Sequence, residues 1–373
     1  MPNNFVNLGD YVNIRTGKLD ANANDPDGLF PFFTCAKEPL QIATFSYDCE
    51  CVLVAGNGDL NVKYYNGKFD AYQRTYIIES LNKELLDVRY LFHFMEQYLE
   101  RLRHMSIGGV IKYIKIGNLT EARLHLPPLP EQRRIAAILD QADQLRVKRR
   151  EALAELDRLT QSIFVEMFGD VINNDKGWQV SSLFDCSDLI QIGPFGTQLH
   201  QEDYIENGIP LVNPTHIKAG RIVPDISLSI SDEKYAQLKQ YHLIEGDIVL
   251  GRRGEMGRCA VVTKKEHGWL CGTGSLFVRL KAQTLSPSFL EFILSSNAMR
   301  SYLENVAQGV TMANLNKTIV GALPIILPPI ELQRKFAKSV ELNDKQKLLH
   351  LESLSSLESL FTSLQHRAFR GEL

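Results

Sequence analysis

The sequence lacks the features that mark membrane, secreted and metal-binding proteins. No apolar run approaches the roughly 18 residues that a transmembrane helix needs, and Met1-Pro2-Asn3-Asn4 shows neither the basic nor the apolar region of a secretory signal. The six cysteines are scattered, Cys49-Glu-Cys51 is too tightly spaced for the usual metal sites, and the nine histidines form no metal-like spacing. We therefore expect a cytoplasmic protein with free thiols, no metal site and no membrane contact.

The chain also lacks an excess of basic residues. Its 41 Lys and Arg against 44 Asp and Glu give a formal net charge of −3, and no long segment is clearly basic. A protein that holds DNA through charge alone is not indicated. If the chain binds DNA, it needs local clusters of cations, a basic partner, or both.

Catalytic motifs are missing as well. Asn213-Pro214-Thr215-His216 does not fit the Asn-Pro-Pro-aromatic motif of an amino-methyltransferase, and the glycine-rich segment Gly251–Arg258 has neither dinucleotide-binding nor Walker A spacing. Nothing resembles a zinc protease, a serine hydrolase or a kinase motif. The sequence predicts no catalytic residue.

An internal repeat is the strongest positive feature. Leu126-Pro127-Pro128-Leu129 recurs 201 residues later as Leu327-Pro328-Pro329-Ile330, and each copy precedes a Gln-Arg-(Arg/Lys) sequence. Further upstream, residues 52–59 resemble residues 248–255. The order is domain, helix, domain, helix, with predicted segments 1–125, 126–170, 171–325 and 326–373.

Each proline pair starts a long helix, because proline is tolerated only in the first helical turn. The helices are expected from Glu131 to Phe168 and from about Glu331 to Phe369, ending at Gly169 and Gly371. About 38 residues span about 57 Å, more than a domain of this size requires. Apolar residues at 3–4 spacing predict a coiled-coil seam formed by Leu139, Ala142, Leu153, Leu156, Ile163, Met167, Val340, Leu354, Leu357, Phe361 and Leu364.

The predicted fold is α+β (mixed α/β): two similar domains with twisted sheets, separated by two helices that form an antiparallel coiled coil with pseudo-two-fold symmetry. Short β-rich runs between Gly, Asn and Asp turns indicate the sheets. The alternative is that each helix lies alone on its own domain.

Polar loops bordered by glycine carry side chains suited to DNA. Arg pairs with guanine, Asn and Gln with adenine, and Ser, Thr and Lys hold phosphates. Candidates in the first domain are Arg15, Thr16, Lys18, Asn57, Asn61, Lys63, Tyr64 and Arg74. Those in the second are Thr197, Gln198, Asn213, Thr215, Arg252, Arg253, Arg258, Thr273 and Ser275. Ordinary solvated turns are the alternative for any one residue; Arg252-Arg253 is the strongest candidate, since folding does not obviously explain two cations directly after a buried strand.

These residues resemble the type I restriction-modification specificity subunit. Residues 126–139 (Leu-Pro-Pro-Leu-Pro-Glu-Gln-Arg-Arg-Ile-Ala-Ala-Ile-Leu), continuing to Phe168-Gly169-Asp170, carry the resemblance, and the second copy is weaker because Glu331-Leu332-Gln333 replaces Pro-Glu-Gln. The resemblance implies two target-recognition domains, each reading one half of a split double-stranded DNA site, and a helical spacer. It implies two methyltransferase subunits that bind S-adenosylmethionine, optional restriction (translocase) subunits that use ATP and Mg²⁺, and no cofactor on this chain.

Two other functions stay open. One is a self-sufficient DNA methyltransferase or nuclease, and the other is a coiled-coil scaffold that does not bind DNA. The basic run Arg146–Arg150 is either a solvated helix face or a contact for spacer-DNA phosphates or an acidic partner.

Overall fold

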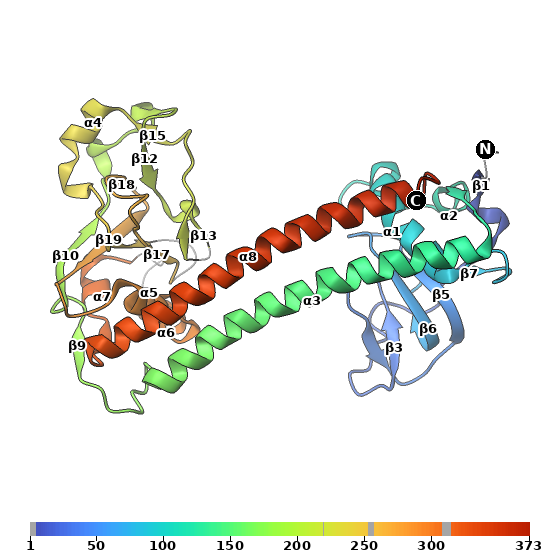
Figure 1. The fold of residues 1–373 in the computed structure, drawn as a ribbon, viewed down its shortest axis with the longest axis horizontal. Helices are drawn as coiled ribbons and strands as arrows, with labels where there is room; N and C mark the ends of the chain where they lie inside the picture. Colours follow the sequence, from blue (N-terminus) through green and yellow to red (C-terminus); the bar gives the residue numbers. More distant parts are fainter. Residues whose placement is uncertain (1–4, 219, 253–256, 308–314) are drawn as a thin grey trace. The chain divides into compact units, whose positions relative to one another are not determined.

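The computed structural model describes residues 5–218, 220–252, 257–307 and 315–373 (Figure 1). It divides into two compact units: unit 1 is Met1–Leu153 with Leu349–Leu373, and unit 2 is Ala154–Leu348. Each unit contains one globular domain and part of both long helices, α3 (Leu129–Phe168) and α8 (Ile330–Ala368). The division runs through these helices, so the boundaries predicted after residues 125, 170 and 325 stay a prediction.

The domain of unit 1 is built on a six-stranded sheet in the order β2-β7-β5-β6-β3-β4. All neighbours are antiparallel except β3 and β6, which run parallel with Phe32 opposite Asp70. A separate pair joins β1 to β8. The strands are β1 (Phe5–Asn7), β2 (Val12–Thr16), β3 (Phe30–Phe33), β4 (Leu40–Ile42), β5 (Tyr47–Ala55), β6 (Val62–Ala71), β7 (Thr75–Ser80) and β8 (Arg123–His125); the short helices are η1 (Leu8–Asp10) and α2 (Ile116–Thr120).

Helix α1 (Val88–Met105) covers one face of this sheet. Its N-cap Asp87 accepts hydrogen bonds from the backbone amides of Arg89 and Tyr90, which would otherwise lack a helical partner. Apolar residues at helical spacing face the sheet and form the larger core, whereas a smaller cluster around Phe33 and Phe69 fills the other face.

The domain of unit 2 has the same plan with a second sheet added. Its main sheet has the order β10-β19-β16-β17, and the second has the order β11-β15-β12-β18. The strands are β9 (Val180–Ser182), β10 (Ser187–Ile192), β11 (Tyr204–Ile205), β12 (Ile209–Val212), β13 (Ile217–Lys218), β14 (Arg221–Ile222), β15 (Ser229–Ile230), β16 (Ile248–Gly251), β17 (Cys259–Val261), β18 (Leu270–Cys271), β19 (Ser275–Leu280) and β20 (Pro324–Ile326). The helices are η2 (Gly196–Gln198), η3 (Gln201–Asp203), η4 (Pro214–His216), α4 (Asp232–Gln237), η5 (Lys239–Tyr241), α5 (Pro287–Ser295), α6 (Asn297–Ala307) and α7 (Lys317–Gly321).

The strand pairing repeats in the register that the sequence suggested. Val52 of β5 lies opposite Ile78, and Ile248 of β16 lies opposite Val278. The parallel pair β12–β18 of unit 2 matches the parallel pair β3–β6 of unit 1. The internal repeat is therefore a repeat of topology, which confirms the predicted fold class of two similar α/β domains.

A buried glutamine fastens the start of each long helix to its domain. Gln132 is fully buried; its Oε1 accepts from the amide of Asp87 (2.9 Å), and its Nε2 donates to the carbonyls of Leu85 and Pro127 (both 2.8 Å). Gln333, 201 residues later and equally buried, accepts from the amide of Ser286 (2.9 Å) and donates to the carbonyl of Pro328 (2.8 Å). The glutamine of the repeated motif is thus a structural fastener.

The opposite helix ends are held by equivalent phenylalanines. In unit 1 Phe369 packs against Tyr90 and Phe94, with ring centroids 5.1 and 5.5 Å away. In unit 2 Phe168 packs against Phe289 at 4.7 Å. Gly169 and Gly371 follow with φ of 76° and 75°, the left-handed conformation in which glycine commonly ends a helix.

Helices α3 and α8 lie side by side in each unit and run antiparallel. Arg150 pairs with Glu358 in unit 1 (2.8 Å), and Asp157 pairs with Lys347 in unit 2 (2.7 Å). Residue numbers rise along α3 in the direction in which they fall along α8, so the two helices have the predicted antiparallel arrangement. The side chains assigned to the seam are all buried or half-buried, although their individual roles stay a prediction.

The basic run of α3 is largely used within unit 1. The Arg146 guanidinium lies 4.1 Å from the centre of the Phe361 ring, and Arg149 Nη1 lies 2.9 Å from His350 Nδ1. Lys148 is exposed. None of the helices in the described part of the chain has the length and apolar character that crossing a bilayer requires.

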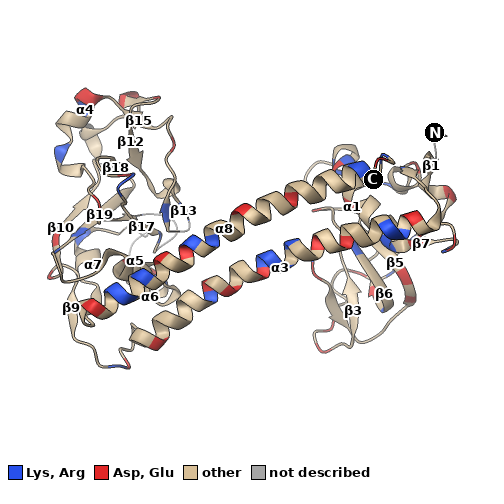
Figure 2. Ribbon diagram, in the orientation of Figure 1, with Lys and Arg blue, Asp and Glu red and all other residues tan. Residues whose placement is uncertain are grey.

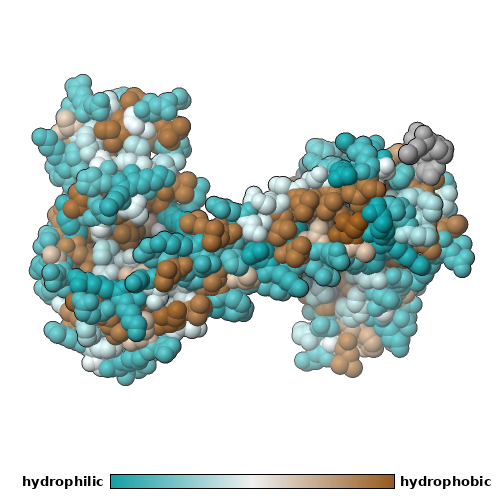
Figure 3. Space-filling view, in the orientation of Figure 1, coloured by the Kyte–Doolittle hydropathy of each residue, from teal (hydrophilic) through white to brown (hydrophobic). Residues whose placement is uncertain are grey.

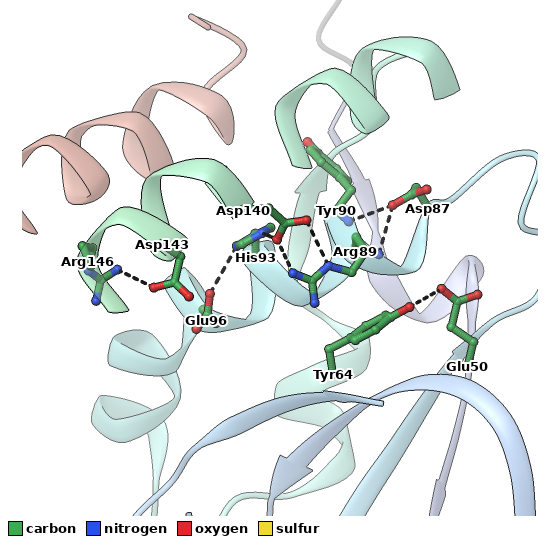
Figure 4. Close-up of polar contacts among 10 residues, drawn as sticks. All are labelled: Glu50, Tyr64, Asp87, Arg89, Tyr90, His93, Glu96, Asp140, Asp143 and Arg146. Atoms are coloured by element: carbon green, nitrogen blue, oxygen red, sulfur yellow. Dashed lines mark hydrogen bonds and ion pairs between the residues drawn. The ribbon is translucent and has the colours of Figure 1, made fainter. Parts of the chain in front are cut away.

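A polar network joins α1 to α3 in unit 1 (Figure 4). The imidazole of His93, 1% exposed, lies between Asp140 (Nε2 to Oδ1, 2.8 Å) and Glu96 (Nδ1 to Oε2, 3.2 Å). Arg89 also donates to Asp140, from Nε at 3.2 Å and from Nη2. Burial disfavours the charged carboxylate of Asp140, but the hydrogen bonds from Arg89 and His93 outweigh it and lower its pKa below the ordinary value of 3.8.

This lowered pKa predicts an acid-sensitive contribution to the stability of unit 1. A group whose folded-state pKa is depressed stabilises the fold above its unfolded pKa and loses that contribution as the pH falls through the folded pKa. We expect Asp140→Asn to lower the free energy of unfolding of unit 1 at pH 7 by on the order of 1–2 kcal/mol. In a urea series from pH 7 to pH 3, the difference from the parent chain should begin to shrink once the pH falls below 3.8. Asp143→Asn, which removes a more exposed carboxylate one turn along the same helix, is the control and should change little. A pH-independent loss would contradict this account.

Candidate nucleic-acid interface

Backbone hydrogen bonds gather four loops of unit 1 at the end of its sheet where β2, β5 and β6 end and β7 begins. Gly17 N donates to the Thr75 carbonyl (3.1 Å), and Gly56 N donates to the Arg74 carbonyl (2.8 Å). Ile114 N donates to the Gly56 carbonyl (2.9 Å), which brings in a segment nearly sixty residues further along the chain. We call residues 17–20, 56–61, 72–74 and 107–114 loop cluster 1.

Unit 2 contains an equivalent set of loops held by equivalent bonds. Gly193 N donates to the Ser275 carbonyl (3.0 Å), and Arg252 N donates to the Gly274 carbonyl (2.9 Å). Leu315 N donates to the Arg252 carbonyl (2.9 Å), as Ile114 does to Gly56. We call residues 193–198, 213–216 and 272–275, with Arg252 and Arg258, loop cluster 2.

The hydrogen bonds that Gly17 and Gly193 donate belong to a backbone frame shared by the two clusters, and both positions require glycine for steric reasons. A Cβ on Gly17 would lie 2.1 Å from the Ala71 carbonyl oxygen, and a Cβ on Gly193 would lie 1.9 Å from the Gly272 carbonyl oxygen. Both distances are far shorter than real carbon–oxygen contacts. The two clusters therefore share a frame in which glycine permits the close approach of neighbouring loops, while the side chains on the frame differ.

Five candidates of the first domain lie in loop cluster 1 or directly beside it. Thr16, Lys18 and Arg74 are exposed, and Asn57 and Asn61 are half-buried. Asn61 is also used in folding, because its Nδ2 donates to the carbonyls of Cys35 (2.8 Å) and Asp59 (2.9 Å). The structure thus brings these residues together, and whether each contacts DNA stays a prediction.

Lys63 is half-buried within the domain and does not extend freely into solvent. Its Nζ donates to Asn61 Oδ1, and burial lowers its pKa. Arg15 lies on β2, where it pairs with Glu79 (2.7 Å) and covers the Tyr47 ring at 4.8 Å. Both cations therefore have partners inside the domain.

Tyr64 is not part of loop cluster 1. Its hydroxyl donates to Glu50 Oε1 (2.8 Å), and Arg89 lies 4.5 Å from its ring centre, on the side of the sheet that α1 covers (Figure 4). Burial and the hydrogen bond to Glu50 raise its pKa to about 12. The expectation that Tyr64 faces DNA does not fit this conformation, because its ring is used to pack the helix on the sheet.

The candidates of the second domain gather in loop cluster 2. Thr215 is exposed, and Asn213 and Thr273 are half-buried. Gln198 Oε1 accepts from the Tyr241 hydroxyl (2.7 Å), so this side chain also holds the loop in place. Asn213 Oδ1 is buried and has no hydrogen-bond partner among the residues that the structure describes.

Three candidates of this cluster are used or buried within the fold, and whether they contact DNA stays a prediction. Arg252 Nε donates to the Leu315 carbonyl (2.9 Å), so folding does account for this cation, contrary to the reason for which it was singled out. Arg258 Nη1 likewise donates to the Pro214 carbonyl (3.1 Å). Ser275 is fully buried on β19, where its hydroxyl cannot reach a ligand without movement of the strand. Arg253 and the side chain of Thr197 lie outside the described residues.

Lys112 is a candidate that sequence reasoning missed. It is exposed, and its carbonyl accepts from Gly58 N (2.9 Å) in loop cluster 1. It lies 38 residues beyond the nearest of the other loops in sequence (112 − 74), so only the fold brings it there. The similarity of Gly109-Val110 to Gly309-Val310 was the available signal that this segment belongs to the repeat.

Comparisons with known proteins agree with this architecture. The family described as type I restriction modification DNA specificity domain matches residues 2–157 and 175–358. The type I restriction enzyme EcoDI specificity subunit of Escherichia coli is 26% identical over 402 residues, covering 99% of this chain and 88% of that protein. The MjaVIII specificity subunit of Methanocaldococcus jannaschii is 21% identical over 367 residues, covering 90% and 84%.

Solved structures show the same fold. The S subunit of a type I restriction-modification system from M. genitalium superposes with a TM-score of 0.65 at 18% identity, covering 98% of this chain and 95% of that one. A chain from a structure of type I restriction-modification complex assembly gives a TM-score of 0.55 at 18% identity, covering 99% and 98%. The family match spans both domains and most of both long helices, and the chain therefore belongs to the type I restriction-modification specificity subunits.

Proposed function

We propose that this specificity subunit reads a bipartite double-stranded DNA site, with one half-site for each loop cluster. The observation that carries the proposal is that the two clusters share one backbone frame and differ in side chains. A common frame offers the same approach to a DNA groove, and different side chains on it select different bases.

The exposed cations of loop cluster 1 suit phosphate contacts. Lys18, Arg74 and Lys112 are exposed at the same edge of the sheet, whereas the chain as a whole has a net charge of −3. Figure 2 shows Lys and Arg positions interspersed with Asp and Glu positions along the ribbons of α3 and α8. Phosphate contacts would position the domain without selecting sequence, and partner subunits would supply the rest of the phosphate binding.

The long helices would act as the spacer and as the docking site for two methyltransferase subunits. Exposed apolar residues occur at equivalent positions of both helices: Val147 and Leu348 are 42% exposed, and Leu159 and Leu360 are 50% exposed. The members of each pair are 201 residues apart, and Figure 3 shows apolar surface along the helices. Two equivalent apolar patches suit two copies of one partner.

We place the chemistry on the partners. Methyltransferase subunits would bind S-adenosylmethionine, and restriction subunits would use ATP and Mg²⁺, while this chain would hold no cofactor. The names of the relatives, which are specificity subunits of larger restriction enzymes, support this division. Incubating the purified chain with DNA, Mg²⁺ and S-adenosylmethionine tests it, because any methylation or cleavage would favour a self-sufficient enzyme. If the chain binds neither specific nor random duplexes, whether alone or with its partners, the result would favour a scaffold that does not bind DNA.

Substitutions confined to one loop cluster should affect one half-site only. We expect Lys18→Ala with Arg74→Ala to weaken binding through the first half-site, and Thr215→Ala with Thr273→Ala to weaken or relax the second. Loss of a good base contact costs about 1–3 kcal/mol, or roughly ten- to hundredfold in affinity, whereas loss of a phosphate contact weakens binding uniformly and reduces its salt dependence.

Methylation maps and binding titrations on duplexes with one altered half-site measure both effects in the complex with partner subunits. Lys83→Ala, which changes an exposed lysine paired with Glu50 away from loop cluster 1, is the control. For Thr215→Ala with Thr273→Ala, equal losses at both half-sites would point to folding damage. For Lys18→Ala with Arg74→Ala, a changed base preference at either half-site would contradict the phosphate role.

A further inference from the structure

The helix pair contains a buried polar layer in unit 2. Asn343 of α8 is 8% exposed and Thr160 of α3 is 7% exposed. Asn343 Nδ2 donates to the Leu156 carbonyl (2.7 Å) and to Thr160 Oγ1, and Thr160 Oγ1 donates to the same carbonyl (3.2 Å). A buried amide is thus satisfied by a specific place on the facing helix.

The equivalent layer of unit 1 is apolar. Asn343 corresponds through the 201-residue repeat to Ala142, and Thr160 corresponds to Phe361. Ala142 and Phe361, 7% and 6% exposed, belong to the core cluster of unit 1. The chain therefore tolerates an apolar pair at this position of the repeat, and the polar pair in unit 2 is not required by the helix geometry.

Burying an amide makes the relative position of two helices specific. If α8 slid by one turn along α3, Asn343 would face the apolar side chain of Leu156 or Phe164, and its Nδ2 would lose the Thr160 hydroxyl as a partner. A buried donor that loses its partner destabilises the fold, whereas apolar side chains exchange partners at small cost. A single buried polar residue is known to fix the register of coiled coils in this way.

A second polar contact between the helices of unit 2 discriminates less strongly between registers. Lys347 pairs with Asp157 at 2.7 Å, but the Asp157 side chain is 72% exposed. Exposed ion pairs contribute little and their long side chains adapt to a shift. Together with the helix ends held at Gln333 and Phe168, the buried layer discriminates between registers of this stretch.

We propose that Asn343 and Thr160 are specificity-determining residues that fix the register of α3 and α8, and thereby the gap at which two half-sites are read. The proposal rests on the proposed function in its second part, since the gap has meaning only if the site is bipartite. Its first part, the register, stands on the geometry alone. The two parts are tested by separate measurements.

The decisive variant is Asn343→Ala with Thr160→Phe, which copies the apolar pair of unit 1 into unit 2. Register is measured by oxidative cross-linking of pairs of introduced cysteines, one of which always replaces Lys347. The other replaces Asp157, which reports the observed register, or Gln161 or Ala154, each about one turn away, which report a shifted register. All these positions lie in unit 2. The chain with only its six native cysteines gives the background.

With the polar layer intact, we expect the off-register cross-links to form at less than about a tenth of the in-register yield, as a penalty above about 1.4 kcal/mol implies. In the variant we expect the off-register yield to rise several-fold, with the in-register link still in the majority because Gln333 and Phe168 continue to hold the helix ends. In the assembled complex, methylation mapping should then show a minority of sites whose gap differs by about one to two base pairs from the parental gap, with unchanged half-sites. The control Lys347→Ala keeps the polar layer and should keep one gap.

A variant that retains one cross-linked register and one gap would overturn the proposal. A parent chain whose methylation map shows no split motif would instead overturn the proposed function, while the cross-links would still decide the register. If the double variant does not fold, Asn343→Ala alone removes the amide with no added volume, and its cross-linking pattern decides the question.

Discussion

Removing Lys148–Ala154 from α3 together with Leu349–Ser355 from α8 should shorten the gap between the half-sites by about three base pairs. Seven helical residues span about 10 Å, and DNA rises by about 3.4 Å per base pair, or 34–36 Å per turn. The half-site sequences should not change, because neither loop cluster loses a residue. Genome-wide methylation mapping with this chain as the only specificity subunit measures both quantities.

The deletion is placed where the helix pair can lose one heptad without changing partners elsewhere. The two segments are equivalent in the repeat and contain the contact between Arg149 and His350. The Asn343–Thr160 layer and the Phe361 side chain lie outside them, and a whole heptad returns the apolar stripe to the same face. Deleting only one of the two segments is the control: it mismatches the helices and should abolish modification. An unchanged gap after the double deletion would show that the helices are not the spacer.

The largest effect on stability is expected from the buried glutamines at the helix starts. Gln132→Ala would leave the amide of Asp87 and the carbonyls of Leu85 and Pro127 without their side-chain partner in a buried place. Each orphaned buried group costs about 1–3 kcal/mol, so a loss of about 3–5 kcal/mol is expected after partial relaxation. Urea unfolding measures this loss.

Hydrogen–deuterium exchange should locate the loss in unit 1 for Gln132→Ala and in unit 2 for Gln333→Ala, because each glutamine bonds only within its own unit. The matched controls are Gln141→Ala and Gln346→Ala, which change exposed glutamines on the same helices and should be nearly neutral. Equal effects from buried and exposed glutamines would refute the fastening role.

The sequence was informative about elements that depend on local or periodic chemistry. The proline pairs and the glycines 169 and 371 delimit helices that the structure has at Leu129–Phe168 and Ile330–Ala368, within two residues of the expected ends. Those signals act within one turn, so no tertiary contact is needed to interpret them. The alignment of residues 52–59 with 248–255 likewise matches the observed strand register.

Individual site residues were less predictable. Tyr64, Arg252 and Ser275 have polar groups suited to DNA, yet the fold uses the first two to hold its own elements and buries the third. The local sequence around a polar residue beside a glycine loop is the same whether its side chain faces solvent or a neighbouring carbonyl. Lys112 was missed for the converse reason, because a backbone bond from Gly58 brings its segment to the loop cluster.

By itself, the sequence determined that one topology occurs twice and that two long helices follow the two copies, because periodicity, proline and glycine act locally. Only the tertiary structure decided where polar groups are satisfied. It gave Gln132 and Gln333 their buried partners, and it brought Asn343 against Thr160 in unit 2, at the position of the repeat that Ala142 and Phe361 occupy in unit 1. A buried hydrogen bond depends on which groups meet from distant parts of the chain, and that meeting has no local signal.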